Sequence, residues 1–82
     1  MEKRIGTITI LVTDRTVTRS VNEVLSQYAE VIVARQGIPF HTRPVAVISL
    51  IVEGEMDQIN ALSGKLGRLG GVEAKLVVAK TA

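Results

Sequence analysis

The sequence predicts one α+β domain, residues 1–82, whose elements follow the order β-α-β-β-α-β. Four segments alternate their apolar residues with the period of a strand, and two segments repeat them with the period of a helix. A chain of 82 residues is shorter than most chains that divide into two domains. No repeat, low-complexity tract or linker interrupts the pattern, so we expect a single folding unit.

The N-terminal part of the chain predicts a strand followed by a helix. Residues 4–12 are rich in β-branched side chains, and Ile8, Ile10 and Val12 share one face of the expected strand. Residues 13–16 offer turn and N-cap chemistry. The helix after them is predicted from one apolar stripe at helical spacing: Val17, Val21, Val24, Leu25 and Tyr28.

Two more strands are predicted in the middle of the chain. Residues 31–35 form the second strand, and Gly37-Ile38-Pro39 is expected to break it. This break would open the longest loop of the chain, which closes at Pro44. Residues 45–52 form the third strand, which is apolar on both faces and therefore expected at the centre of a sheet.

The C-terminal part predicts a second helix and a last strand. The helix carries an apolar stripe made of Met56, Ile59, Leu62, Leu66 and Leu69. Acidic residues near its start and basic residues near its end suit the helix dipole. Gly70-Gly71 is expected to end it, and residues 72–79 form the fourth strand.

This order is the split βαβ pattern of the ferredoxin-like sandwich. Right-handed crossovers then predict a four-stranded antiparallel sheet of order 4-1-3-2 with two helices on one face. The opposite face would be bare although the strands are apolar on both sides. We therefore predict a homo-oligomer, a dimer or a tetramer, paired through that open face or through the edge of the second or fourth strand. A monomer with a mildly apolar surface is the alternative.

Composition argues against most catalytic chemistry. The chain has no cysteine, which excludes disulfides, thiolate metal sites and cysteine nucleophiles. Its one histidine, His41, has no carboxylate in local ligand spacing and no convincing serine or aspartate partner. We therefore predict no catalytic residues, no metal and no cofactor, and expect that the protein is not an enzyme.

Charge and hydropathy narrow the partners. Ten Lys and Arg residues against eight Asp and Glu residues give a net charge of +2, with both signs interspersed. Nucleic-acid-binding surfaces normally show clustered basic residues, so this pattern argues against nucleic acid. The most apolar run, residues 45–52, is far below the roughly 20 residues that cross a bilayer. We expect a soluble cytoplasmic protein that contacts no membrane.

Two segments are candidate ligand-binding sites. The first comprises Arg35, which could hold a carboxylate or phosphate, together with Gly37, Ile38 and Pro39. The second comprises Ser63, Gly64 and Lys65, which resemble a phosphate loop but fall inside the second predicted helix. Close packing of the helix at its glycines is therefore the favoured interpretation of the second segment, and ligand contact is the alternative.

Three stretches of the chain together form a distinctive pattern. They are Val21-Asn22-Glu23-Val24-Leu25-x-x-Tyr28, then Arg35-x-Gly37-Ile38-Pro39, then Asp57-x-Ile59-x-Ala61-Leu62-Ser63-Gly64-Lys65-Leu66-Gly67 with Gly71-Val72 after it. With these stretches the chain resembles the family of iron-only hydrogenase system regulators. The resemblance implies an ACT-like version of the ferredoxin-like fold, similar to the ligand-sensing domain of nickel-responsive repressors. It also implies a role in iron-only hydrogenase expression or maturation, with no catalytic residues to carry over. One histidine and no cysteine cannot reproduce the nickel site of those repressors.

The sequence therefore predicts a non-enzymatic, oligomeric regulatory module that binds a small-molecule effector or a protein partner. Arg35, Gly37, Ile38 and Pro39 would contribute to the site, with Ser63, Gly64 and Lys65 as further candidates. Ligand sensing would bias oligomeric or partner-binding states and so act on transcription. The alternative function is a nucleic-acid-binding regulator that uses four basic residues: Arg35, Arg43, Lys65 and Arg68.

Overall fold

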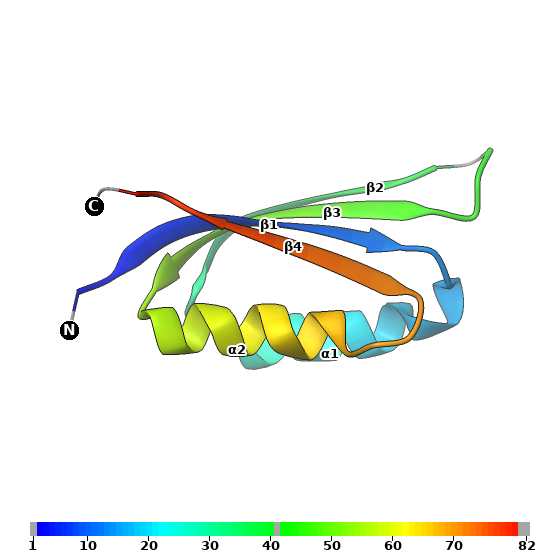
Figure 1. Ribbon diagram of the computed structural model, residues 1–82. Helices are drawn as coiled ribbons and strands as arrows, with labels where there is room; N and C mark the ends of the chain where they lie inside the picture. The colour runs from blue at the N-terminus through cyan, green and yellow to red at the C-terminus, as the bar shows by residue number, and fades with distance from the viewer. Residues whose placement is uncertain (1, 41, 81–82) are drawn as a thin grey trace.

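The computed structural model describes residues 2–40 and 42–80, and its elements follow the predicted order. They are β1 (Arg4–Val12), the short 3-10 helix η1 (Arg15–Val17), α1 (Thr18–Gln27), β2 (Ile32–Pro39), β3 (Ala46–Gly54), α2 (Met56–Gly67) and β4 (Val72–Val78). All strand pairs are antiparallel, and the strand order is β2-β3-β1-β4. Both helices lie under the same face of this sheet (Figure 1). The predicted ferredoxin-like fold is confirmed.

The core lies between the sheet and the helices and consists of aliphatic side chains. No polar or charged residue of the described chain is buried there. The pleat of each strand sends alternate residues into this layer, as the burial patterns of β1 and β3 show. The largest fully buried side chains come from two central strands and both helices: Ile8, Ile10, Val12, Val21, Leu50, Val52, Ile59, Leu62 and Leu66.

Strand β2 corrects one prediction of the sequence. Gly37-Ile38-Pro39 does not break the strand: Gly37 pairs with Ile48, Ile38 with Val47, and Pro39 with Ala46. Proline is tolerated because β2 is an edge strand, where a residue can turn its missing N–H away from the sheet. The loop to β3 is correspondingly shorter than expected. His41, predicted in that loop, lies outside the described residues.

Side chains at the helix starts fix how the helices enter the fold. Asp14 caps η1 by accepting hydrogen bonds from the backbone N–H of Thr16 at 2.9 Å and from its hydroxyl at 2.6 Å. Glu55 and Gln58 form a reciprocal capping box at the start of α2. The guanidinium of Arg15 donates to the carbonyl oxygens of Phe40 and Arg43, which ties the β2–β3 turn to η1.

The second face of the sheet is not covered by any described element (Figure 1). Its residues form rows across the strands, because the registers align them: Ile38, Val47, Leu11 and Glu73 form one row, and Ala34, Ile51, Thr7 and Val77 another. Val77 is 65% exposed and Ile51 46% exposed. This open face is the one that the alternating pattern predicted to be apolar and bare. Within the described chain, neither α1 nor α2 is long and apolar enough to cross a membrane.

Candidate functional site

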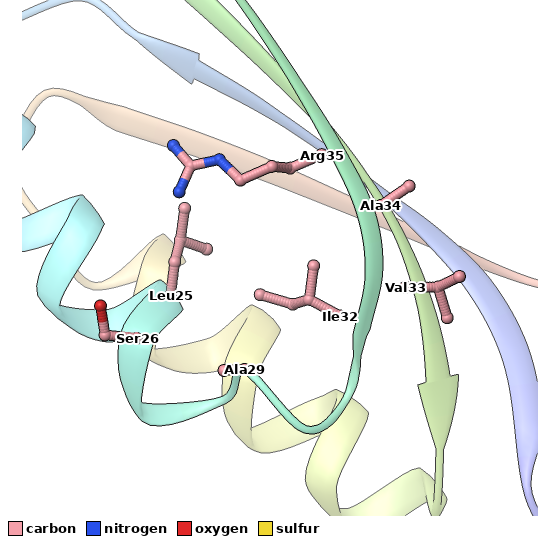
Figure 2. A pocket seen from close by; sticks show the side chains of 7 residues that line it. All are labelled: Leu25, Ser26, Ala29, Ile32, Val33, Ala34 and Arg35. Carbon is pink, nitrogen blue, oxygen red and sulfur yellow. The ribbon is translucent and has the colours of Figure 1, made fainter.

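A β-bulge in β2 determines where Arg35, the basic residue of the first candidate segment, points. The register shifts between Ile32 and Ala34, so Val33 is the extra residue. Simple alternation would place Ile32 and Arg35 on opposite faces of the strand. The bulge instead turns both side chains toward α1, whereas Val33 and Ala34 point away from it (Figure 2).

Arg35 lies beside a shallow hollow between α1 and β2. The hollow has a volume of about 370 Å³ and is lined by Leu25, Ser26, Ala29, Ile32, Val33, Ala34 and Arg35. Figure 2 shows the guanidinium extending over Leu25 toward the helix. The site therefore combines an apolar floor, formed by Leu25 and Ile32, with a cationic group and the hydroxyl of Ser26 at its margin.

The guanidinium of Arg35 is held by a neutral group. Its Nη2 donates a hydrogen bond to Oδ1 of Asn22 on α1 at 3.2 Å, and both residues are exposed. An amide acceptor orients the guanidinium without neutralising its charge. The arrangement can therefore attract a carboxylate or a phosphate group.

The structure separates the residues of the first candidate segment. Arg35 and Gly37 pair with the buried Leu50 and Ile48, which places them on the helix-covered side of β2. Ile38 pairs with Val47 on the open face and is 48% exposed. Pro39 follows at the end of the strand. Of the first segment, only Arg35 lines the hollow.

The second candidate segment lies on α2, across α1 from this hollow. Lys65 Nζ donates to Oε1 of Gln27 at 3.4 Å and sits 5.3 Å from the ring centre of Tyr28, a cation–π contact. Lys65 therefore joins α2 to the end of α1, whereas Arg35 approaches α1 from β2. The two halves of the predicted site do not come together within one chain.

The glycines of α2 are not explained by packing within the described chain. A Cβ atom at Gly64 would meet only Nη2 of Arg68, at 3.9 Å, and one at Gly67 would meet nothing within 4 Å. Each glycine costs a helix about 1 kcal/mol relative to alanine. Among the described residues, the close packing favoured for these glycines is therefore not found.

The remaining polar residues do not assemble a second site. Among residues 2–40 and 42–80, no group of three His, Cys, Asp or Glu residues lies close enough to hold a metal ion. Glu55, in the acidic cluster before α2, acts as the helix cap. A hydrogen bond from the hydroxyl of Thr16, and a weaker contribution from its backbone N–H, lower the pKa of Asp14 below its usual range. This suits the capping role of Asp14.

The sequence offered a partial signal for the residues it missed. Asn22 and Ser26 are four apart in the predicted helix, so a shared face could have been inferred. Their position beside Arg35 could not, because it depends on the bulge at Val33.

Solved structures of other proteins are similar to this chain. A solved structure of the uncharacterized protein TM1266 from Thermotoga maritima is 44% identical to this chain, with a TM-score of 0.92, and the match covers 96% of this chain and 100% of that one. The divalent ion tolerance protein CutA1 from Ehrlichia chaffeensis is 7% identical, with a TM-score of 0.50, and covers 100% of this chain and 87% of that one. The CutA1 likeness shows a shared fold alone. No curated protein matches this chain.

The TM1266-like family, described as "Iron-only hydrogenase system regulator, putative", matches residues 4–76. This span contains all three stretches on which the resemblance was based, and it runs from the start of β1 into β4. The chain therefore belongs to the TM1266-like family.

Proposed function

We propose that this protein is a non-enzymatic cytoplasmic module that regulates an iron-only hydrogenase system by sensing a small anionic effector. Membership of the TM1266-like family supports the regulatory role. The observation that carries the effector site is the guanidinium of Arg35, which is oriented by Asn22 over an apolar hollow.

The chemistry of the hollow suits a small acid. A guanidinium has five N–H donors in a fixed fork, and a carboxylate or phosphate can accept two of them at once. The hydrogen bond to Asn22 is made by Nη2 alone. The volume of about 370 Å³ is near the lower end of the range for small-molecule sites. A metabolite with one acidic group and a short apolar part fits these limits.

Effector binding would act through the edge of the sheet. The hollow joins β2 to the C-terminal half of α1, so a ligand held by Arg35 would fix the helix relative to this strand. A ligand shifts a conformational equilibrium only by its difference in affinity for the two states. We infer that the bound form favours one arrangement of α1 and β2, which a hydrogenase-system partner recognises.

A thermal-shift screen of the purified protein tests this function. The panel contains amino acids, short carboxylic acids, nucleotides and inorganic phosphate, each tested against wild type, Arg35→Ala and Arg35→Lys. A ligand at 100 times its Kd stabilises the folded state by about 2.7 kcal/mol, which raises Tm by several degrees in a domain of this size. Arg19→Ala, which removes an exposed arginine on α1 that does not line the hollow, is the matched control.

The expected result is a stabilising anion whose effect is lost in Arg35→Ala, weakened in Arg35→Lys and unchanged in Arg19→Ala. A shift that survives Arg35→Ala would place the ligand elsewhere. A flat screen across all anions would reject the effector site and favour a protein partner.

The nucleic-acid alternative receives less support from the positions of its basic residues. Arg35 lies on β2, Arg43 in the β2–β3 turn, and Lys65 contacts Gln27 and Tyr28 at the junction of the two helices. A nucleic-acid site would give binding that weakens steeply with salt concentration. The absence of any affinity for DNA or RNA at low salt would eliminate this alternative.

A further inference from the structure

The two edges of the sheet differ in their capacity to pair with another strand. Strand β2 carries the bulge at Val33 and a proline, Pro39, within eight residues. A bulge and a proline are both features that protect an edge strand from pairing. Strand β4, at the other edge, pairs with β1 over seven residues without any irregularity.

The backbone groups of β4 that face the free edge can be assigned. Thr13 N–H donates to the Gly71 carbonyl at 2.8 Å, and Ala79 N–H donates to the Ile5 carbonyl at 2.9 Å. At both ends of the ladder, odd-numbered residues on the β4 side therefore bond to β1. Because bonding alternates along an antiparallel strand, Ala74 and Leu76 turn their N–H and C=O groups to the free edge.

The side chains of β4 are complementary to a second copy of the same strand. If two copies pair antiparallel with Ala74 opposite its own equivalent, Glu73 of each copy faces Lys75 of the other on the open face. The same register places Val72 opposite Leu76 on the helix-covered face. Opposite charges directly across a strand pair stabilise it. A shift of the register by one residue in each copy would instead place the two Lys75 ammonium groups together.

A hollow on the open face lies next to the proposed interface. It has a volume of about 580 Å³ and is lined by residues of β1 and β4: Thr9, Leu11, Glu73, Ala74, Lys75 and Val77. Glu73 and Lys75, the charged residues of the proposed pairs, therefore stand on the open face beside the β4 edge, within reach of the same residues of a second copy.

The side of helix α2 that faces away from α1 could also contact a second copy at the β4 edge. Lys65 faces α1, and Ser63 and Gly67, each two residues away, lie about 160° around the helix from it. Since α1 contacts β2 at the opposite edge, this flank of α2 faces outward beyond β4 (Figure 1). The missing side chain at Gly67 leaves room for a second helix, which would account for a glycine whose Cβ would meet nothing within 4 Å among the described residues.

We propose that β4 is the interface of a homodimer, in which two copies form one continuous eight-stranded sheet about a twofold axis at Ala74. The two β2 edges, each with its Arg35 hollow, then lie at the far ends of the dimer. The dimer is closed, because β2 is protected from pairing with further copies. This inference goes beyond the proposed effector site, and either can fail without the other.

Charge reversal tests the interface and its register. Sedimentation equilibrium over a range of concentrations gives the dimer Kd of wild type, Glu73→Lys, Lys75→Glu and the double reversal. Each single reversal opposes like charges twice across the axis, so we expect Kd to rise at least about tenfold. The double reversal restores both pairs and should return Kd to within about threefold of wild type.

Ile51→Lys separates edge pairing from stacking of the open faces. Ile51 is 46% exposed on β3, away from the edge, and its replacement should leave the dimer intact. A monomeric wild-type protein would overturn the proposal. So would single reversals without effect, or loss of the dimer in Ile51→Lys. Circular dichroism of each variant verifies that it is folded.

Discussion

The two edges of the sheet differ in regularity, although each is a single antiparallel strand. Strand β2 is irregular: a bulge at Val33 and a proline at position 39 interrupt its free edge, and the bulge directs Arg35 onto α1. Strand β4 is regular, and its free edge carries an alternating set of backbone donors and acceptors. In a small ferredoxin-like domain, irregularity can build a ligand site while regularity leaves a surface for self-association.

The largest expected effect concerns the turn that leads into β4. Gly71 has a φ of 77°, and a Cβ atom there would lie 2.5 Å from the Cβ of Asp14. Gly71→Ala should therefore lower the free energy of unfolding by about 2 kcal/mol or more, measured by urea denaturation. Gly70→Ala is the matched control, because its Cβ would meet nothing within 4 Å. Equal stability of the two variants would contradict the strain assigned to Gly71.

A pair of proline substitutions compares the edges directly. Ala74→Pro removes an N–H group from the free edge of β4, whereas Gly37→Pro removes one from the free edge of β2. The bonding pattern predicts that neither residue donates to its own sheet, so both variants should keep their fold. Sedimentation should show at least about a tenfold weaker dimer for Ala74→Pro, about 1.4 kcal/mol, and no change for Gly37→Pro. Equal effects would remove the distinction between the edges.

Two glycines of α2 test whether this helix contributes to the proposed dimer interface at β4. Gly64→Ala and Gly67→Ala should each raise the free energy of unfolding of the monomer by up to about 1 kcal/mol, since a Cβ atom meets no close contact at either position. Of the two glycines, Gly67 lies on the flank of α2 that faces outward beyond β4. Gly67→Ala should therefore also weaken the dimer, whereas Gly64→Ala should not. Urea denaturation of dilute protein measures the stability of the monomer, and sedimentation measures the Kd of the dimer. A dimer that is insensitive to Gly67→Ala would remove α2 from the interface.

The smallest effect concerns Asp14, next to the turn of β4. Hydrogen bonds from the hydroxyl and the N–H of Thr16 hold the pKa of this carboxyl below its usual range. Its unfolded-state pKa is about 3.9. The resulting stabilisation is therefore complete above that value and is lost as pH falls through the lower folded-state pKa. Asp14→Asn should show a shallower fall of Tm below about pH 4; an unchanged profile would contradict this origin.

Most of the fold could be predicted from the sequence because its periodicities are undisturbed. The stripes of the two helices and the alternation in β1 and β3 match the buried side chains, and the crossover rule gives the observed strand order. The prediction that Gly37-Ile38-Pro39 ends the second strand is wrong, because local breaker residues say nothing about position in the sheet. At an edge, β3 continues to pair with them.

The candidate site was predicted less completely. Arg35 was identified by its chemistry, but its neighbours depend on a one-residue bulge that leaves no periodic signal. Lys65 is a further candidate because its segment resembles a phosphate loop, but α1 separates it from Arg35. The glycines of α2 suggest close packing, but among the described residues a Cβ atom at Gly67 would meet nothing within 4 Å, so this packing is not found there.

Residue-resolved amide hydrogen exchange tests the difference between the two edges most directly. In the concentrated protein, the N–H groups of Ala74 and Leu76 should exchange slowly because a second copy of β4 accepts them, whereas those of Arg35 and Gly37 should exchange fast. Dilution below the dimer Kd should remove the protection of Ala74 and Leu76 alone. If Ala74 and Leu76 exchange as fast as Arg35 and Gly37 at the highest concentration, β4 is a free edge and the account is wrong.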